Sequence, residues 1–470
     1  MDSRLQEQLR AARAEGEPGA WLAAGRSLLR SGEGEAAGEA VAALASDRDR
    51  MRELLRSLEP ASLESFELSV VGERFARERV RDVAWSCDGS RLYLLCGRRG
   101  SELVELDPAT GRGAILRRFP GRGRAVACDG AGRLAVCHLD ASEEHTELSL
   151  REPEGEWRPL KVPRSAWFSE LSLLLSGGEL CGRNKKAVRA YPLAGGRARW
   201  SVRGEALACG LAGVAALEGE ELLLYDPGEK TPRARAPLDE LCPSRIKLSR
   251  AADPQLMASA EGAAILYPVV PRGRTPQRIT LHGHDLIVPP QPIWHVAWVD
   301  DRCDLLGRRA LPEVELYDQA LSPTGRYLLL LERSPDERTL RSREAHLVDL
   351  ETGDSRALEL PALPGRPAWS LSGRSLAIGS DEGSVLLIRA GEQGAGGATP
   401  GGAQGEGWRE LRSAERFWRI RQREQRLELH YGLLGTQGTR REVELESSEA
   451  AGRELERRIS ATARKGYEAI

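Results

Sequence analysis

VAWSCDGSRLYLLCG, residues 83–97, contains a short apolar run, a turn of small and polar residues, an arginine and a second apolar run. The same order returns in AVACDGAGRLAVCH (125–138), QALSPTGRYLLLLE (319–332) and PAWSLSGRSLAIGS (367–380). Short apolar runs bounded by turn-forming residues are typical of β-strands. Each copy therefore predicts an antiparallel hairpin.

A second pattern follows these hairpins, a strand that ends in an Asp- and Gly-containing turn. It is seen in LVELDPATGR (103–112), LLLYDPGEKT (222–231) and AHLVDLETGD (345–354). Two hairpins make a four-stranded unit that cannot bury its own faces, and radial stacking of such units buries them. Residues 61–390 therefore predict a β-propeller of seven or eight blades, at about 40 to 45 residues per blade.

The two ends of this region suggest how the ring closes. ASLESFELSVV (61–71) offers one isolated strand, whereas the last copy (367–390) offers three. We expect the early strand to complete the last blade. Residues 282–311 fit the pattern poorly, which leaves the blade count open by one. The tryptophans of the strand patterns are expected to fill the space between blades: Trp85, Trp294, Trp298 and Trp369.

This region resembles the WD-repeat-like propellers, although no blade ends in Trp-Asp and the usual Gly-His start is missing. The resemblance implies a fold rather than one particular partner. Some bacterial propeller proteins of this kind accompany ATPases and von Willebrand factor A-type proteins. The resemblance implies a protein partner of that sort here.

Residues 1–60 predict helices. Leu5, Leu9 and Ala12 repeat at helical spacing, and further helices are expected at 18–29, at 35–44 and from an N-cap at Ser46 to Pro60. We expect them to form a cap that packs on the propeller. At the other end of the propeller region, residues 391–407 hold eight glycines in seventeen positions, a composition typical of a flexible linker.

Residues 408–470 predict a small α+β domain. Phe417, Ile420, Leu427 and Leu429 are the expected core positions of its strands. A glycine-rich turn follows, and Ser447 or Ser448 can cap a helix whose apolar residues fall four apart. The overall fold class is therefore mainly β, with an N-terminal helical cap and a C-terminal α+β unit.

The C-terminal region resembles the WGR domain over nearly all of 415–470. Arg416-Phe417-Trp418 matches the aromatic first strand, Tyr431-Gly432-Leu433 stands where the family has Trp-Gly-Arg, and Lys465-Gly466-Tyr467 closes the domain. In the nuclear poly(ADP-ribose) polymerases such domains contact DNA ends and neighbouring domains. The resemblance implies these contact residues: Arg416, Trp418, Tyr431, Gly432, Leu433, Gly435, Arg440, Arg441 and Lys465.

Two departures from the family motif bear on the ligand. Tyr431 keeps a smaller stacking face than Trp, and Leu433 removes the charge and donor fork of Arg. Residues 408–470 hold 14 Lys and Arg against 11 Asp and Glu, an excess of three positive charges. Nucleic-acid binding therefore stays open, and a protein or intramolecular contact is favoured.

Composition narrows the class of protein further. The 68 Lys and Arg balance 70 Asp and Glu, so the chain is no strongly basic nucleic-acid coat. Its eight cysteines include no C-x-x-C pair, which argues against a zinc ribbon or a thioredoxin-like motif. The first residues, MDSRLQEQLR, are charged, and no apolar stretch approaches the roughly 20 residues that span a bilayer. We expect a cytoplasmic protein without membrane contact.

Few residues suggest chemistry. His282 and His284 form an H-x-H pair beside Asp285, and His295 is available, but solvent-exposed loop histidines are the favoured interpretation. The basic segment GRGRAVACDG (121–130) is interpreted as a loop between blades that leads into a strand, and GRNKKAVR (182–189) and RGRTPQR (272–278) as solvated loops. No nucleophile elbow, Walker loop or dinucleotide fingerprint occurs in a suitable context. We expect no catalytic, cofactor-binding or metal-binding residues.

Three functions remain to be compared. The favoured one is a non-catalytic scaffold whose propeller binds a protein, while the tethered WGR-like domain makes a second contact. The alternative is an accessory protein, linked to DNA ends or ADP-ribosylation, that binds nucleic acid through the WGR-like domain. The third is a propeller hydrolase or lactonase with a metal on its axis.

Overall fold

The computed structural model describes most of the 470 residues. The described ranges are 3–31, 34–44, 47–71, 79–97, 100–129, 132–153, 155–162, 170–173, 179–183, 187–210, 213–226, 228–243, 254–269, 277–281, 284–288, 293–334, 341–391, 409–412, 416–423, 425–433, 439–444, 447–448, 450–451, 455, 457–458 and 468–469. The chain divides into two compact units, Met1–Glu392 and Gln393–Ile470. The predicted linker lies almost wholly outside the described residues.

Helices begin the first unit: α1 (Ser3–Glu15), α2 (Pro18–Ser31), α3 (Gly34–Leu44) and α4 (Arg48–Leu58). They pack on one another through buried apolar residues that include Leu28, Leu44 and Leu54. The N-cap of α4 is Asp47, whose carboxylate accepts a hydrogen bond from the backbone N–H of Arg50. The predicted cap at Ser46 is therefore wrong by one residue.

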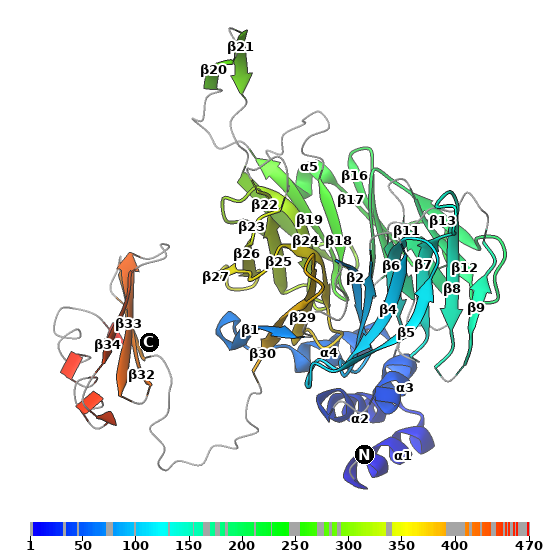
Figure 1. Ribbon diagram of the computed structural model, residues 1–470, viewed down its shortest axis with the longest axis horizontal. Coiled ribbons are helices and arrows are strands. Elements are labelled where there is room, and N and C mark those ends of the chain that lie inside the picture. The colour runs from blue at the N-terminus through cyan, green and yellow to red at the C-terminus, as the bar shows by residue number, and fades with distance from the viewer. Residues whose placement is uncertain are drawn as a thin grey trace. The chain divides into compact units, whose positions relative to one another are not determined.

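Within the described residues, seven four-stranded antiparallel sheets follow the helices and form the blades of a propeller (Figure 1). Blades 1 to 3 are β2 (Val80–Trp85), β3 (Leu92–Cys96), β4 (Ser101–Leu106), β5 (Gly113–Phe119); β6 (Gly123–Cys128), β7 (Leu134–Leu139), β8 (Thr146–Arg151), β9 (Trp157–Leu160); and β10 (Glu170–Leu173), β11 (Glu179–Arg183), β12 (Ala187–Pro192), β13 (Trp200–Arg203).

The remaining blades complete the ring. They are β14 (Ala206–Gly210), β15 (Gly213–Glu218), β16 (Glu221–Tyr225), β17 (Ala234–Pro237); β18 (Gln255–Ala258), β19 (Gly262–Val269), β22 (Ile293–Asp300), β23 (Leu305–Ala310); β24 (Leu316–Leu321), β25 (Tyr327–Glu332), β26 (Glu344–Asp349), β27 (Ser355–Glu359); and β28 (Pro364–Trp369), β29 (Ser375–Ser380), β30 (Val385–Ala390), β1 (Phe66–Val71). A short helix, α5 (Leu238–Leu241), follows β17, and a 3₁₀ turn, η1 (Leu63–Ser65), precedes β1.

Most first strands contact the first strands of the neighbouring blades, and blade 3 meets β14 of blade 4 through β11 and β12. Contacts join β2 to both β6 and β28, β6 to β10, β14 to β18, and β24 to both β18 and β28. The seventh blade takes its outer strand from the start of the chain, because β1 pairs antiparallel with β30 from Phe66–Ala390 to Val71–Val385. The predicted propeller and its closure by the early strand are confirmed, with seven blades.

The two recurring sequence patterns meet in space within a blade. The arginine after the first turn pairs with the Asp that begins the second turn, at 3.4 Å for Arg91–Asp107 and 2.9 Å for Arg326–Asp349. Each Asp also accepts backbone N–H groups of its own turn. The sequence repeat therefore encodes one contact that ties both hairpins of a blade together.

Tryptophans join neighbouring blades as predicted. Trp85 in blade 1 donates its indole N–H to the carbonyl of Ala368 in blade 7 at 2.9 Å. Trp369, at the matching position of blade 7, donates to the carbonyl of Ala320 in blade 6 at 3.2 Å. Both rings fill space between sheets, and their polar N–H groups are satisfied.

An inserted hairpin explains why residues 282–311 fit the repeat poorly. Strands β20 (Gln277–Leu281) and β21 (His284–Val288) pair only with each other and lie in the connection between β19 and β22. The third strand of blade 5 therefore comes later in the sequence than the repeat predicts. The insertion displaces the pattern without adding a blade.

The helices pack against the ends of neighbouring blades. Arg56 makes two hydrogen bonds of 2.7 and 2.5 Å to the carboxylate of Glu261, and Arg52 binds the carbonyl of Ala260 at 3.0 Å. The apolar core of the helices also includes Ala260 and is contacted by Cys87 and Leu371. These propeller residues lie in the turns between first and second strands of blades 5, 1 and 7, so the helices cover that end of the propeller.

The second unit is a five-stranded antiparallel sheet in the order β34-β33-β32-β31-β35. Its strands are β31 (Arg409–Arg412), β32 (Arg416–Arg423), β33 (Arg426–Leu433), β34 (Thr439–Glu444) and β35 (Glu468–Ala469). Ile420, Leu427 and Leu429 are buried against Ala451 and Leu455 of the helical segment. Ser447 caps this segment through a hydrogen bond from the N–H of Ala450 to its hydroxyl.

Three of the four predicted core positions of this sheet are confirmed, because Ile420, Leu427 and Leu429 are buried. The fourth, Phe417, pairs with Gly432. Its side chain lies outside the described ones, so this core position stays a prediction.

Phe66 tests the closure of the ring. It is 1% exposed and meets Tyr327 and Trp369 edge-to-face at 5.1 and 5.9 Å. Phe66→Ala is expected to lower the free energy of unfolding of the first unit by about 3 to 5 kcal/mol, because a large buried ring is lost. Val70→Ala, on the same strand at a 54% exposed residue, should change it by less than about 0.5 kcal/mol. Equal effects in chemical denaturation would contradict a buried closing strand.

Glu59 tests the contact between helices and propeller. It follows α4, accepts a hydrogen bond from the hydroxyl of Thr324 and lies near Asp349. Burial, reinforced by nearby carboxylates, raises the pKa of Glu59 to about 7. The native state therefore binds a proton that the unfolded chain has released, and stability falls as pH rises from the ordinary carboxyl pKa of 4.5 to about 7.

Replacing this carboxylate should remove the pH effect. Glu59→Gln is expected to stabilise the first unit at pH 8, on the order of 2 kcal/mol, and to have little effect at pH 5. Thermal melting at both pH values measures this. Glu17→Gln, the same change at an exposed side chain, is the matched control. A gain for Glu59→Gln that is equal at both pH values would show that Glu59 is not protonated in the folded protein.

Candidate functional site

The sheet of the second unit holds the residues predicted from the WGR resemblance. Trp418 on β32 and Tyr431 on β33 are direct cross-strand partners, and Arg416 pairs with Leu433 one step along. On β34, Arg440 pairs with His430 and Arg441 with Leu429. Gly435 and Lys465 lie outside the described residues.

The register divides these residues between the two faces of the sheet. Arg416, Trp418, Tyr431, Leu433 and Arg441 share the parity of Ile420 and Leu429, which are buried against the helical segment. Gly432 and Arg440 take the opposite parity. The predicted contact positions therefore take both parities along the sheet. Their side chains lie outside the described ones, so the contact set stays a prediction.

Strand β32 has a row of arginine positions, alternating with Ile420, that the sequence analysis did not single out. Arg419, Arg421 and Arg423 alternate along β32. Their partners on β33 are His430, Glu428 and Arg426, so one acidic position, Glu428, interrupts the basic ones. In the sequence of β32, arginines alternate with Trp418, Ile420 and Gln422. This period of two could have predicted the row.

The predicted histidines are not gathered into a site. His284 begins β21, and His282 lies outside the described residues. His295 lies on β22 beside the ring of Tyr267, with 5.7 Å between centroids, and burial lowers its pKa. Within the described part of the chain, no three His, Cys, Asp or Glu side chains are arranged to hold a metal ion.

One acid–base pair in the propeller was missed because its members are 14 residues apart. The imidazole Nε2 of His346 lies 2.9 Å from a carboxylate oxygen of Glu332. Burial, followed by a hydrogen bond with Glu344, raises the pKa of Glu332. Such a pair can move a proton. It lies on β25 and β26, however, and not on the first strands that surround the axis.

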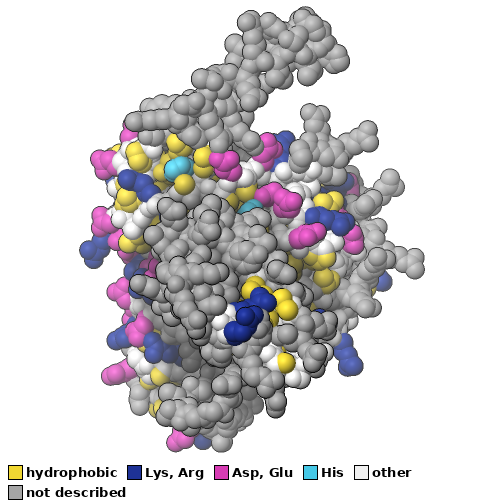
Figure 2. All heavy atoms as spheres, turned by 90° about the vertical axis from the view of Figure 1, so that its left-hand side faces the viewer, with side chains coloured by type: hydrophobic (Ala, Val, Ile, Leu, Met, Phe, Trp, Pro, Cys, Tyr) yellow, Lys and Arg dark blue, Asp and Glu magenta, His cyan; other side chains and the backbone are white. Residues whose placement is uncertain are grey.

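Charge on the molecular surface is mixed. In Figure 2, described acidic and basic side chains are interspersed over the visible face and do not form a broad patch of one sign. No disulfide joins any of the eight cysteines, all of which the structure describes, and burial raises the pKa of Cys87 and Cys96 to about 12. They are packing residues rather than reactive thiolates. In the described part of the chain, no helix has the length and apolar character to cross a membrane.

Comparison with known families agrees with the C-terminal resemblance. Residues 409–470 match the WGR domain family, so the chain carries a WGR domain at its C-terminal end, joined to a seven-bladed β-propeller. Among curated proteins, none matches this chain.

Proposed function

We propose that this protein is a non-catalytic scaffold whose propeller binds a protein partner while its WGR domain makes a second contact. The observation that supports the proposal most directly is the division of the chain into two separately packed units. Joining two binding units in one chain raises the effective concentration of the second contact once the first has formed. The glycine-rich composition of residues 391–407 suits such a joint.

The helices limit which surfaces the propeller offers. They occupy the end formed by the turns between first and second strands, at Ala260, Cys87 and Leu371. The other end carries the connections between blades and between second and third strands, including the β20–β21 insertion. A partner of the propeller would bind at that second end. ATPases and von Willebrand factor A-type proteins are the candidates that the propeller's resemblance suggests. The described cysteines form no disulfide, which suits a cytoplasmic location.

Separate capture experiments test this proposal. Immobilised fragments 1–391 and 409–470 are each incubated with lysate of the source organism, and bound proteins are identified against the full chain. We expect fragment 1–391 to retain a specific protein captured by the full chain and the full chain to release it more slowly. The fragment begins at residue 1 because the helices are part of the packed unit.

Two results would contradict the scaffold proposal. One is the absence of any partner shared by the full chain and fragment 1–391. The other is turnover of ester or lactone substrates that chelation abolishes and metal restores, which would favour the axial-metal enzyme.

A nucleic-acid contact through the WGR domain is the second candidate function. It is favoured by the family match and by the arginine row of β32, at 419, 421 and 423. Phosphates of a duplex end could pair with such a row of arginines. The contact would depend on salt because bound phosphates release counterions.

Charge variants of the full chain distinguish this candidate. If it is correct, Arg419→Gln/Arg421→Gln/Arg423→Gln should lower the slope of log affinity against log salt by about 3 for a blunt-ended duplex. The matched variant Glu428→Gln/Glu442→Gln, on the same face, should strengthen binding. Fluorescence anisotropy measures both. If the full chain does not bind the duplex at low salt, the proposed nucleic-acid contact is excluded.

A further inference from the structure

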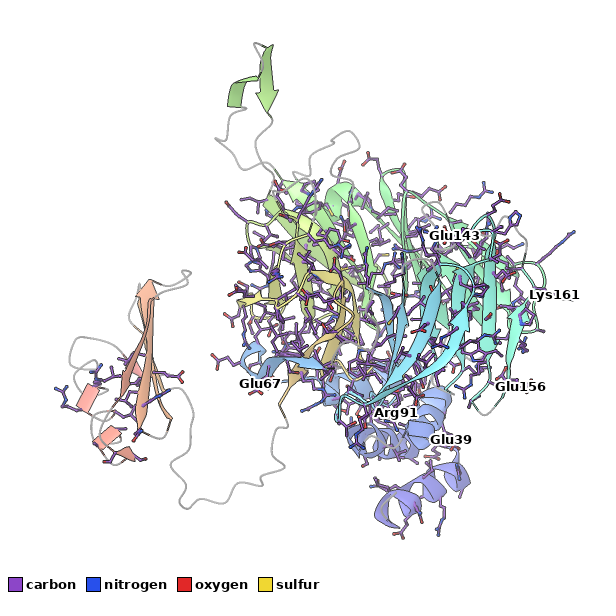
Figure 3. All side chains as sticks on the ribbon, viewed as in Figure 1. Glu39, Glu67, Arg91, Glu143, Glu156 and Lys161 are labelled. Atoms are coloured by element: carbon purple, nitrogen blue, oxygen red, sulfur yellow. The ribbon has the colours of Figure 1, made fainter. Side chains whose placement is uncertain are left out.

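Two cysteines from neighbouring blades point into the same interface. Cys181 lies on β11, the second strand of blade 3, and Cys209 lies on β14, the first strand of blade 4. Side chains fill the space between neighbouring sheets of the propeller (Figure 3). The apolar cluster between blades 3 and 4 contains Cys181, and Cys209 packs against it. Leu180 and Ala208, one position away on each strand, belong instead to the clusters on the far sides of these blades.

The strand directions place the two cysteines opposite each other. First strands run toward the helix-covered end and second strands return from it, so β11 and β14, which are in contact, run antiparallel. The guanidinium of Arg183 donates a hydrogen bond to the backbone carbonyl of Leu207 across this contact. Cys181 precedes Arg183 by two residues, and Cys209 follows Leu207 by two. Equal steps from one contact along antiparallel strands bring the cysteines opposite each other, with both side chains in the interface.

The two thiols interact directly. A hydrogen bond with the side chain of Cys209, followed by burial, raises the pKa of Cys181. Cys181 therefore keeps its proton as the donor, and the sulfur of Cys209 is the acceptor. Cys181 is 2% exposed, whereas Cys209 is only partly buried. An oxidant that arrives from solvent would meet Cys209 first.

This arrangement differs from that of an isolated buried thiol, which has no second sulfur to react with. A disulfide requires two cysteines whose side chains point toward each other across a short gap. Opposite positions in one interface meet that requirement. The sequence analysis did not pair Cys181 with Cys209, because they are 28 positions apart and belong to different blades.

We propose that Cys181 and Cys209 form a redox modification site, which a peroxide converts to a disulfide between blades 3 and 4. The sulfur of Cys209 first attacks the peroxide. A sulfur–oxygen bond forms, the oxygen–oxygen bond breaks, and water leaves with the thiol proton, so that Cys209 becomes a sulfenic acid.

The second step closes the disulfide. The sulfur of Cys181 attacks that of Cys209, the sulfur–sulfur bond forms, and the sulfur–oxygen bond breaks. The departing hydroxide takes the proton of Cys181 and leaves as a second water. In total, two thiols are oxidised to one disulfide, and one hydrogen peroxide is reduced to two waters.

The disulfide would tie two blades together covalently. Cross-linking positions that are 28 residues apart restricts the unfolded chain, so the oxidised first unit should be more stable than the reduced one. A thiol reductant would reverse the bond, and a disulfide that forms and is reduced again is the usual kind in a reducing compartment. This inference goes beyond the scaffold function and does not depend on it.

Peptide mapping of the full chain tests the site. The native protein is treated with hydrogen peroxide at neutral pH, remaining thiols are alkylated in denaturant, and tryptic peptides are analysed by mass spectrometry. Trypsin releases residues 165–183 and 204–230, each of which contains one cysteine. We expect these two peptides to be linked after peroxide and separate after dithiothreitol. Recovery of both as unlinked peptides, or a higher yield of either cysteine linked elsewhere, would overturn the site.

Single-cysteine variants test the order of the two steps. In Cys181→Ala the sulfenic acid of Cys209 cannot be resolved, so dimedone should label Cys209 after peroxide. Cys128→Ala is the matched control, because Cys128 is also partly buried and ends the first strand of blade 2. It should form the link between Cys181 and Cys209 as the wild type does. Loss of the link in this control contradicts the assignment, and the wild-type mapping decides alone if Cys181→Ala does not fold.

Thermal melting tests whether the disulfide ties the blades together. Oxidised wild type should melt about 3 to 5 °C above the reduced protein, because the cross-link restricts the unfolded chain. Peroxide should produce no such rise in Cys181→Ala. A link between Cys181 and Cys209 without a higher melting temperature, or an equal rise in the variant, would show that this disulfide does not join the blades in the native fold.

Discussion

Pairing of β1 with β30 is the interaction on which the first unit depends. The strand brings residues 66–71 beside residues 385–390, so the two ends of a ring of seven sheets are joined by backbone hydrogen bonds. Loop-closure entropy rises only slowly with chain length, so one well-packed strand is sufficient to hold such a ring shut. Phe66 adds a buried aromatic cluster with blades 6 and 7. The sheets stack face to face, and opening the ring would expose the faces of two blades together.

Closure of the ring by the N-terminal segment also makes the two ends of the propeller different, because the helices pack on only one of them. The same N-terminal segment that supplies β1 first forms α4, whose Arg52 and Arg56 bind the turns of blade 5. Glu59 and Pro60 then meet Thr324 and Tyr327 of blade 6 before the strand begins. One end is thereby covered by the chain's own helices. At the other end, the strand register shifts near the start of the first strand in four successive blades.

Much of this architecture could be predicted from the sequence because it repeats. Short strands, Asp-Gly turns and paired Arg and Asp positions recur often enough to predict a propeller, and an unmatched early strand predicted the closure. The bulges could not be predicted, because one extra residue in Arg79-Val80-Arg81 leaves the apolar pattern almost unchanged. The segment 121–130 was therefore interpreted as a loop between blades that leads into a strand, although the inner strand already begins at Gly123 and has Arg124 in its bulge. The WGR-like motif predicted where the C-terminal domain lies in the chain. Only the strand register shows that Tyr431 and Arg440 take opposite parities along the sheet.

Hydrogen exchange in the native state tests the closed ring most directly. In the full chain, amides of residues 66–71 that pair with β30 should exchange as slowly as those of β28–β30, because they open only when the blade opens. Exchange of those amides at the rate of surface turns, with the other three strands of the blade still protected, would contradict a ring held shut by its N-terminal strand.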